Sequence, residues 1–438
     1  MPTQTEGRRA GHASETARVL ASVLLPNVAR GVILRRPLAT GLAAGLDTDR
    51  AAAGVLHGLR ERHGDDPFPI SLAGRRAAVV LAPEDVERLL RETPEPFSPG
   101  GREKSGALSH FQPHGVLVSE HADRPRRRWA NEAALVPGQA IHPDGDTLAA
   151  QADEEALALA LALEGDLDWR RFSRSFNAMA RRAVFGAFAA RDYRTTELLR
   201  ALRARANWAY LAPARRATRT EFLDRVRANV ERAEPGSLAA RLAEDAAEDA
   251  DVRPEEQVAH WLFAFDAAAI AAFRALALLT SLSPGGHEVR EEIEDREGLD
   301  LPLLRATVRE SVRLWPTTLM IIREGTRETF WRERSFEAGT AFLVVSSYFH
   351  RDSTRLPYAD AFEPGIWLDG RAAREPALVP FSGGPAECPA VDLVPLAVSL
   401  FLRSLVRGRR PARADAGGPL PASGLPRSLN HFALRFSL

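Results

Sequence analysis

The segment PFSGGPAECPA, residues 380–390, contains Cys388, the only cysteine in a chain of 438 residues. Pro389 follows it directly, and because proline favours the first position of a helix, the sequence predicts a helix start there with Cys388 as the N-cap. Free backbone N–H groups and the positive end of the helix dipole would stabilise a thiolate at that position. Gly383 and Gly384 allow positive φ angles and leave the backbone open to a flat group. Cys388 is therefore a candidate nucleophile or metal ligand, and the alternative is a buried structural cysteine.

The composition is that of a soluble globular protein and excludes several classes of function. Hydrophobic residues make up 45% of the chain and charged residues 26%. Basic and acidic residues number 58 each, so no net charge would hold the protein on nucleic acid or on an anionic membrane. A single cysteine excludes an internal disulfide framework and any zinc site that needs two thiolates.

Two apolar stretches could be taken for targeting or membrane segments. Residues 19–28 contain Pro26 and lack a small-x-small cleavage site, so we predict an amphipathic N-terminal helix rather than a signal peptide. Residues 258–282 are interrupted by His260, Asp266 and Arg274, which argues against a membrane-spanning helix. We therefore expect a soluble cytoplasmic protein without a membrane partner.

Hydrophobic periodicity predicts a mostly α-helical chain with minor β-structure. A hairpin is expected where residues 68–70 and 76–81 flank Ala73 and Gly74. No internal repeat or long linker divides the chain, so we predict a helical extension over residues 1–45 and a single domain over residues 46–438. The predicted helices cover residues 84–92, 124–135, 148–163, 169–190, 194–211, 219–232, 255–283, 286–296 and 302–314, and short strands are expected near residues 320–323, 330–331 and 342–347.

A second motif, Glu310-Ser-Val-Arg313, lies in a predicted helix that Pro316 ends. Residues three apart share one helix face, so the carboxylate and the guanidinium can pair. Taken alone, this spacing is also common in surface pairs.

Together these segments resemble the cytochrome P-450 superfamily. Its cysteine-ligand loop has the pattern Phe-x-x-Gly-x-Arg-x-Cys-x-Gly, with which Phe381, Gly384 and Cys388 are in register, while Ala386 and Ala390 replace the Arg and the last Gly. The family also has the Glu-x-x-Arg motif and, later, a Phe-x-Pro segment that joins it.

The Phe-x-Pro segment is matched here by residues 362–367, with Ile366 where an Arg is common. The resemblance covers residues 55–438 and is firmest over residues 301–405.

The resemblance implies a single triangular cytochrome P-450 fold with a long central helix and small β-sheets. It implies haem b as cofactor, with Cys388 as the ligand of the iron. Arg323 matches a position that commonly binds a haem propionate. Arg127 and Arg128 are the candidates for a second donor, His121 is a weaker one, and a solvated basic helix face is the alternative for the arginines.

The long central helix of the family corresponds to the alanine-rich stretch around residues 261–272. Most members have an acid and a threonine side by side there, whereas this chain has Ala267 and Ala268. Asp266 is the candidate proton relay, and the alternative is that it pairs with an arginine or faces solvent. The helices of residues 194–232 would cover the distal pocket.

The function implied by the resemblance is that of a haem-thiolate monooxygenase of secondary metabolism. It would hydroxylate or epoxidise a lipophilic small molecule with O2 and electrons from a ferredoxin or flavoprotein reductase. The departures at Ala267, Ala268, Ala386 and Ala390 leave two alternatives open. One is an enzyme that uses peroxide or rearranges its substrate, and the other is a non-catalytic scaffold that binds a partner protein.

Overall fold

The computed structural model describes residues 4–72, 74–119, 122–246 and 249–438. Ala73 and His121 lie outside the described residues. The first helices are α1 (Gln4–Val19), α2 (Leu25–Arg30), α3 (Pro37–Gly45), α4 (Thr48–His63), α5 (Pro83–Arg91), α6 (Arg102–Leu108), α7 (Arg124–Leu135), α8 (Gly145–Leu161) and α9 (Trp169–Phe185). They are followed by α10 (Tyr193–Ala206), α11 (Arg216–Glu231), α12 (Leu238–Ala246), α13 (Pro254–Leu279), α14 (Pro284–Asp295), α15 (Pro302–Leu314), α16 (Ser346–His350) and α17 (Leu393–Val406).

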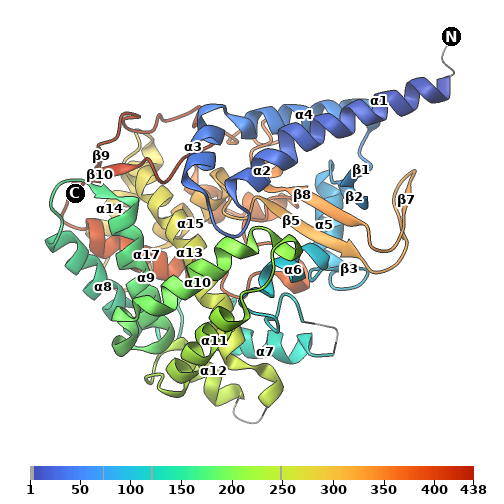
Figure 1. Cartoon of the computed structure of the whole chain (residues 1–438). Coiled ribbons are helices and arrows are strands. Elements are labelled where there is room, and N and C mark those ends of the chain that lie inside the picture. The colour runs from blue at the N-terminus through green and yellow to red at the C-terminus, as the bar shows by residue number, and fades with distance from the viewer. Residues whose placement is uncertain (1–3, 73, 120–121, 247–248) are drawn as a thin grey trace.

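Helix α13 runs through the middle of the helical part of the molecule (Figure 1). Helices α9, α11, α15 and α17 all pack against it, which makes it the centre of the larger hydrophobic core. In the described part of the chain, one stretch, residues 250–279, is long and apolar enough to cross a membrane, and 78% of its most apolar window is buried inside the protein. Because neighbouring helices cover α13, its apolar sequence is explained by core packing.

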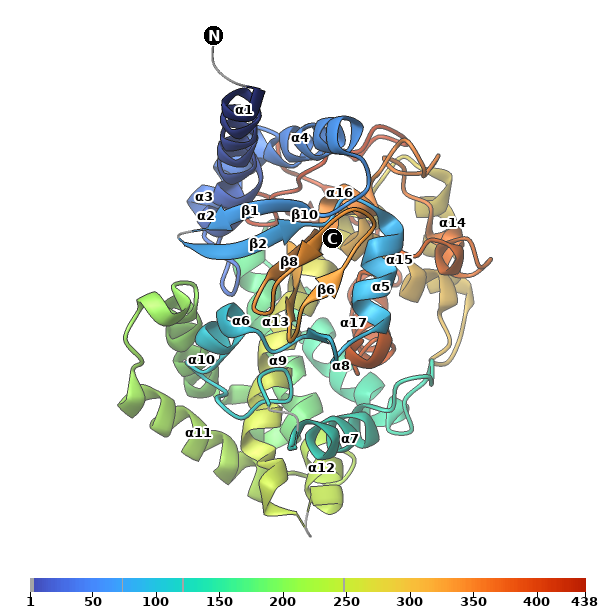
Figure 2. The same ribbon diagram turned by 90° about the vertical axis from the view of Figure 1, so that its right-hand side faces the viewer.

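The main sheet lies beside the helical part and combines strands from both ends of the sequence (Figure 2). Its order is β1-β2-β8-β5-β3, from β1 (Phe68–Leu72), β2 (Arg75–Val79), β3 (Phe97–Ser98), β5 (Met320–Gly325) and β8 (Ala341–Val345). The hairpin of β1 and β2 is antiparallel, as the sequence predicts, and β2 runs parallel to β8. A second hydrophobic cluster joins this sheet to α4 and α5.

Two smaller sheets complete the β-structure of the described residues. Strands β4 (Leu167–Asp168) and β9 (Ala412–Arg413) flank β10 (Arg435–Ser437), and β6 (Thr329–Phe330) pairs with β7 (Ser335–Phe336). The predicted fold class, mostly α with small sheets, is therefore confirmed.

The N-terminal segment and the segment that follows α10 lie close together. Arg30 of α2 pairs with Asp49 of α4 at 2.8 Å, and the Asn207 side chain accepts hydrogen bonds from the backbone N–H groups of Ile33 and Leu34. Trp208, Tyr210 and Leu211, at the turn between α10 and α11, are exposed. Helix α11 packs on α13. The central helix is therefore covered by α11, while these three side chains point to the surface.

Candidate functional site

The loop that contains Cys388 is held by backbone hydrogen bonds. The N–H of Cys388 donates to the carbonyl of Phe381 at 2.9 Å, and the N–H of Val391 donates to the carbonyl of Cys388 at 3.1 Å. Helix α17 begins only at Leu393, so the predicted helix start at Pro389 is wrong.

Pro395 gives the physical reason for this correction. Proline is tolerated in the first turn of a helix but not in its interior, where it removes a hydrogen bond and clashes with the preceding turn. A helix that began at Pro389 would place Pro395 in its interior, whereas a start at Leu393 keeps Pro395 in the first turn. The residues after Cys388 therefore form a turn that precedes α17.

The Cys388 thiol is surrounded by protein, yet its side chain keeps some free surface. Burial raises the pKa of the thiol, while the Ala390 N–H and Arg128 oppose that rise. A thiol with a raised pKa is a poor nucleophile at neutral pH, whereas binding to a metal ion removes its proton outright. The geometry therefore favours the metal-ligand role over the nucleophile role.

The Glu310–Arg313 pair lies at the centre of a fully buried network. Arg313 donates from Nε and Nη2 to the two carboxylate oxygens of Glu310, each at 2.6 Å, and neither side chain is exposed. The remaining N–H groups of Arg313 donate to backbone carbonyls of residues 350–361, at 2.7 Å in the case of Ala361. This network ties α15 to the irregular segment that precedes the cysteine loop.

The segment at residues 362–367 joins the network through Glu310 rather than through an arginine. The backbone N–H of Glu363 and the indole N–H of Trp367 donate to the Glu310 carboxylate at 2.9 and 3.0 Å. Trp367 therefore provides a donor that Ile366, which is buried among apolar residues, does not.

Three cations converge near the cysteine loop without an acidic partner. Arg323 of β5 is buried and donates to Ser382 Oγ of the loop and to Thr93 Oγ1, both at 3.0 Å. Burial together with Arg124 lowers the pKa of Arg323 to about 10, and burial together with Arg323 and Arg124 lowers the pKa of Lys104 to about 7. In the part of the chain that the structure describes, no carboxylate forms an ion pair with any of the three.

Two solved structures share this fold. Cytochrome P450 CYP175A1 from Thermus thermophilus has a TM-score of 0.66 at 20% identity, over 89% of this chain and 96% of that one. A six-coordinated cytochrome P450, also from Thermus thermophilus, has a TM-score of 0.62 at 20% identity, over 87% and 94% of the two chains. The sequence model described as Cytochrome P450 matches residues 286–408, which include Glu310, Arg313 and Cys388. Residues 286–408 therefore match the cytochrome P450 family, and the fold of the chain is that of solved cytochrome P450 structures.

Curated relatives match this chain over shorter stretches. Cyclooctat-9-en-7-ol 5-monooxygenase from Streptomyces melanosporofaciens is 30% identical over 160 residues, which are 32% of this chain and 35% of the relative. Dimethylnonatriene synthase from Arabidopsis thaliana is 32% identical over 26% of this chain and 23% of its own length. Mitochondrial sterol 26-hydroxylase from Mus musculus is 31% identical over 27% and 24%. The chain thus spans about a third or less of the length of these relatives.

Haem is the cofactor that the match to the cytochrome P450 family implies, and the residues present fit it. Its iron accepts a thiolate, which the half-buried residue Cys388 can provide. Its two propionates are anions, for which Lys104, Arg124 and Arg323 form a cationic cluster in which no carboxylate of the described residues is ion-paired. Lys104 and Arg124 would thus bind the propionates together with Arg323, which the sequence predicts for this role.

Arg127 and Arg128 both have partners within the protein, and Arg128 lies close enough to Arg124 and Cys388 for its charge to act toward a lower pKa in both. Arg127 pairs with Asp123 at 3.1 Å and donates to Ser119 Oγ and the Asp251 carbonyl. Arg128 pairs with Glu132 at 2.6 Å and donates to the Glu387 carbonyl beside Cys388. Their propionate-binding role stays a prediction. The signal that sequence reasoning missed is Lys104, the only lysine in the chain.

On α13, Asp266 accepts a hydrogen bond from Arg203 of α10 at 2.8 Å. Its role as a proton relay stays a prediction, because this ion pair is the alternative that the sequence left open. A further polar group of α13 is His260, whose Nδ1 accepts from the Gln112 amide at 2.8 Å and whose pKa burial lowers to about 4. His260 is therefore neutral at pH 7, and a histidine within an apolar helix was the signal that could have found it.

Gly384 is needed for the close approach of the cysteine loop to α5. Its φ is +62°, and a Cβ there would lie 2.1 Å from the Leu90 carbonyl oxygen. We expect Gly384→Ala to destabilise the protein by about 2 kcal/mol or more and to lower haem retention, because the loop must move. Thermal unfolding and the haem-to-protein ratio would measure both effects.

The neighbouring glycine offers a matched control for that variant. Gly383 has an extended φ of −176°, and a Cβ there would first meet Leu90 Cδ1 at an ordinary 3.4 Å. Gly383→Ala should therefore leave stability nearly unchanged. Equal effects of the two substitutions would contradict the packing argument.

Proposed function

We propose that the protein binds haem b through Cys388 and is a monooxygenase that hydroxylates or epoxidises a lipophilic small molecule. The observation that carries this proposal is a half-buried cysteine whose loop contacts a cluster of three cations, none of which forms an ion pair with a carboxylate of the described residues. When bound, a thiolate-ligated haem supplies the redox chemistry for O2 activation. Hydroxylation of a substrate RH would consume O2, two electrons and two protons and would yield ROH and water, with the electrons coming from a ferredoxin or flavoprotein reductase.

Each element of the chain would have a distinct part in this function. Cys388 would ligate the iron, and Arg323, Arg124 and Lys104 would neutralise the propionates. Small side chains at Ala264, Ala267 and Ala268 would let α13 lie close to a flat cofactor. The packing of α11 on α13 would exclude water from the distal side.

The curated relatives support the proposed class of substrate. Two of the named relatives are a monooxygenase of cyclooctat-9-en-7-ol and a hydroxylase of a sterol, which are largely apolar molecules. By analogy, the substrate of the present chain would be a lipophilic compound of secondary metabolism. Asp266 lies on the stripe of α13 that carries Leu262 and Ile270, so it would act as proton relay only if its ion pair with Arg203 opens and its carboxylate turns toward the face of Ala267 and Ala268.

One observation favours a second candidate, oxidation driven by peroxide. Positions 267 and 268 are alanines, so no hydroxyl group stands beside Asp266 to pass protons toward bound oxygen. Peroxide already contains the two electrons and two protons that O2 activation requires. A single experiment on the purified protein separates the candidates: turnover with O2 and a reductase system supports the first, and turnover with peroxide alone supports the second.

The haem proposal itself is tested by reducing the purified protein and adding carbon monoxide. A red-shifted Soret band, typical of haem bound to thiolate, is the expected result. Purified protein that binds no haem when haem is supplied would refute both candidates.

Lys104 links haem binding to pH. Its pKa is lowered to about 7 from an ordinary value of 10.5, so between these pH values the unfolded chain binds a proton that the folded, haem-free protein does not. Stability of the haem-free protein therefore rises with pH from about 7 to about 10. Lys104→Met should remove this rise and should stabilise the haem-free protein most below pH 7.

With haem bound, the same substitution should act in the opposite direction, because a propionate loses a cationic partner. Haem transfer to apomyoglobin should then be faster from the Lys104→Met variant than from the unsubstituted protein. Slower or unchanged transfer would contradict the role of Lys104 in haem binding.

A further inference from the structure

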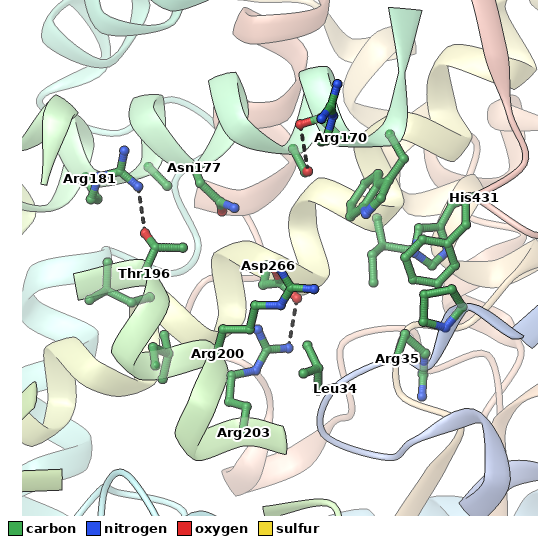
Figure 3. A pocket seen from close by; sticks show the side chains of 18 of the residues that line it. Leu34, Arg35, Arg170, Asn177, Arg181, Thr196, Arg200, Arg203, Asp266 and His431 are labelled. Atoms are coloured by element: carbon green, nitrogen blue, oxygen red, sulfur yellow. Dashed lines mark hydrogen bonds and ion pairs between the residues drawn. The ribbon is translucent and has the colours of Figure 1, made fainter. Parts of the chain in front are cut away.

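A cavity of about 380 Å³ lies between α9, α10 and α13, and the loop at residues 34–37 and the C-terminal residues His431 and Phe432 complete its wall (Figure 3). Its volume falls within the range of small-molecule sites, roughly 300–1,000 Å³. Neither Cys388 nor any of the three cations beside it lines this cavity. No role in the proposed function accounts for it.

The cavity lies on a different face of α13 from the alanines assigned to the haem side. Leu262, Asp266 and Ile270 line it, and their spacing of four places them on one stripe of the helix. Ala264 is two residues from both Leu262 and Asp266, which is roughly 200° around a helix of 3.6 residues per turn. Ligands on these two faces would therefore be separated by the helix itself.

The charges that line the cavity are strongly unbalanced. Asp266 is its one acid, and it is already paired with Arg203. Arg181 donates to the Ala189 and Ala190 carbonyls and to Thr196. The arginines of the lining are Arg35, Arg170, Arg181, Arg200 and Arg203. The lining therefore has an excess of positive charge that a bound anion would neutralise.

Arg35 is the arginine best placed to bind an anion. It is enclosed by protein, its side chain keeps free surface, and it donates only to the carbonyls of Gly31 and Thr317 (2.5 Å for the latter). Burial and the positive charges of Arg30, Arg274 and Arg203 lower its pKa to about 9, and the charge of Asp49 opposes this shift only in part. In the described part of the chain no carboxylate forms an ion pair with Arg35, Arg170 or Arg200.

The other lining residues are mostly apolar, which favours an anion with an apolar group attached. Leu34, Trp169, Leu199, Leu262, Ile270 and Phe432 contribute apolar surface. A guanidinium binds a planar carboxylate through two parallel hydrogen bonds. We propose that this cavity is a second ligand site, which binds a small carboxylic acid with an aromatic or aliphatic body through Arg35 and Arg200.

The test is calorimetric titration of the purified full-length protein with 4-phenylbutyrate, and with 4-phenylbutyramide as the neutral analogue. The acid should bind about tenfold or more tightly than the amide, because a charged hydrogen bond is lost in the amide. Equal affinity of the two compounds, or no binding of the acid, would overturn the proposal.

Variants locate the site. Arg35→Gln should weaken binding of 4-phenylbutyrate by about tenfold or more. Arg200 is exposed and has no ion pair among the described residues, so Arg200→Gln should weaken binding of the acid without affecting the fold. Ser173→Trp should block the cavity from the α9 side. Arg215→Gln, an exposed arginine that does not line the cavity, is the matched control and should change nothing.

These variants keep the proposal separate from the haem proposal. If Arg35→Gln does not fold, Arg200→Gln and Ser173→Trp decide the outcome. Unchanged affinity for the acid in both of these variants would refute the second site. It would also be refuted if the acid shifted the haem spectrum with the same midpoint as the calorimetric titration, because the acid would then bind near the haem. The titration does not require haem, so it can succeed or fail independently of Cys388.

Discussion

Replacement of Cys388 by alanine is expected to abolish the red-shifted carbon monoxide band completely and to lower the haem content of the purified protein. The chain has no other cysteine, so no second thiol can replace the ligand. The propionate-binding cations are unchanged in this variant, and some haem can still enter. Haem that does enter should therefore show a carbon monoxide band without the red shift.

Cys388→Ser controls for the packing of the side chain, since serine is nearly the same size as cysteine. The sulfur packs against the larger hydrophobic core, so alanine also leaves a small void there. Both variants should lose the thiolate band, and the serine variant should keep more of its thermal stability. A red-shifted band that persists in either variant would exclude Cys388 as the iron ligand.

The second large effect is expected for Glu310→Ala. Arg313 has no exposed surface, so removal of Glu310 leaves a buried guanidinium without its carboxylate. Breaking a buried pair in this way costs about 3–5 kcal/mol. The indole of Trp367 and the N–H of Glu363 lose their acceptor as well, which adds to the loss. Urea unfolding followed by circular dichroism would measure the change in the free energy of unfolding.

An ion pair of the same region whose acid is exposed is the control for this variant. Asp300, just before α15, pairs with Arg305 at 2.8 Å, and its side chain is 64% exposed. Exposed pairs contribute about 0–1 kcal/mol, so Asp300→Ala should have a small effect. A loss for Glu310→Ala as small as the loss for Asp300→Ala would contradict the central place of the network.

The features that the sequence predicted well are those whose residues lie close together along the chain. Glu310 and Arg313 are three residues apart on one helix, and the structure shows them paired. By contrast, Lys104, Arg124 and Arg323 come from α6, α7 and β5, and only the tertiary fold brings them together.

The helix start at Pro389 failed for a related reason. Proline does favour the first turn of a helix, but the proline that occupies the first turn of α17 is Pro395 rather than Pro389. The ion pair of Asp266 with Arg203 joins α13 to α10 and was likewise beyond the reach of local patterns.

The parallel pairing of β2 with β8 has a consequence for how the protein is made. Residues 77–79 pair with residues 341–343, so the N-terminal hairpin cannot find its neighbour strand until most of the chain has left the ribosome. At a synthesis rate of roughly 5–20 residues per second, the edge of β2 waits on the order of tens of seconds. During that time its unpaired backbone groups are open to association with other nascent chains. The cell must therefore shelter β2 throughout synthesis, and chains interrupted before residue 341 are those most exposed to aggregation.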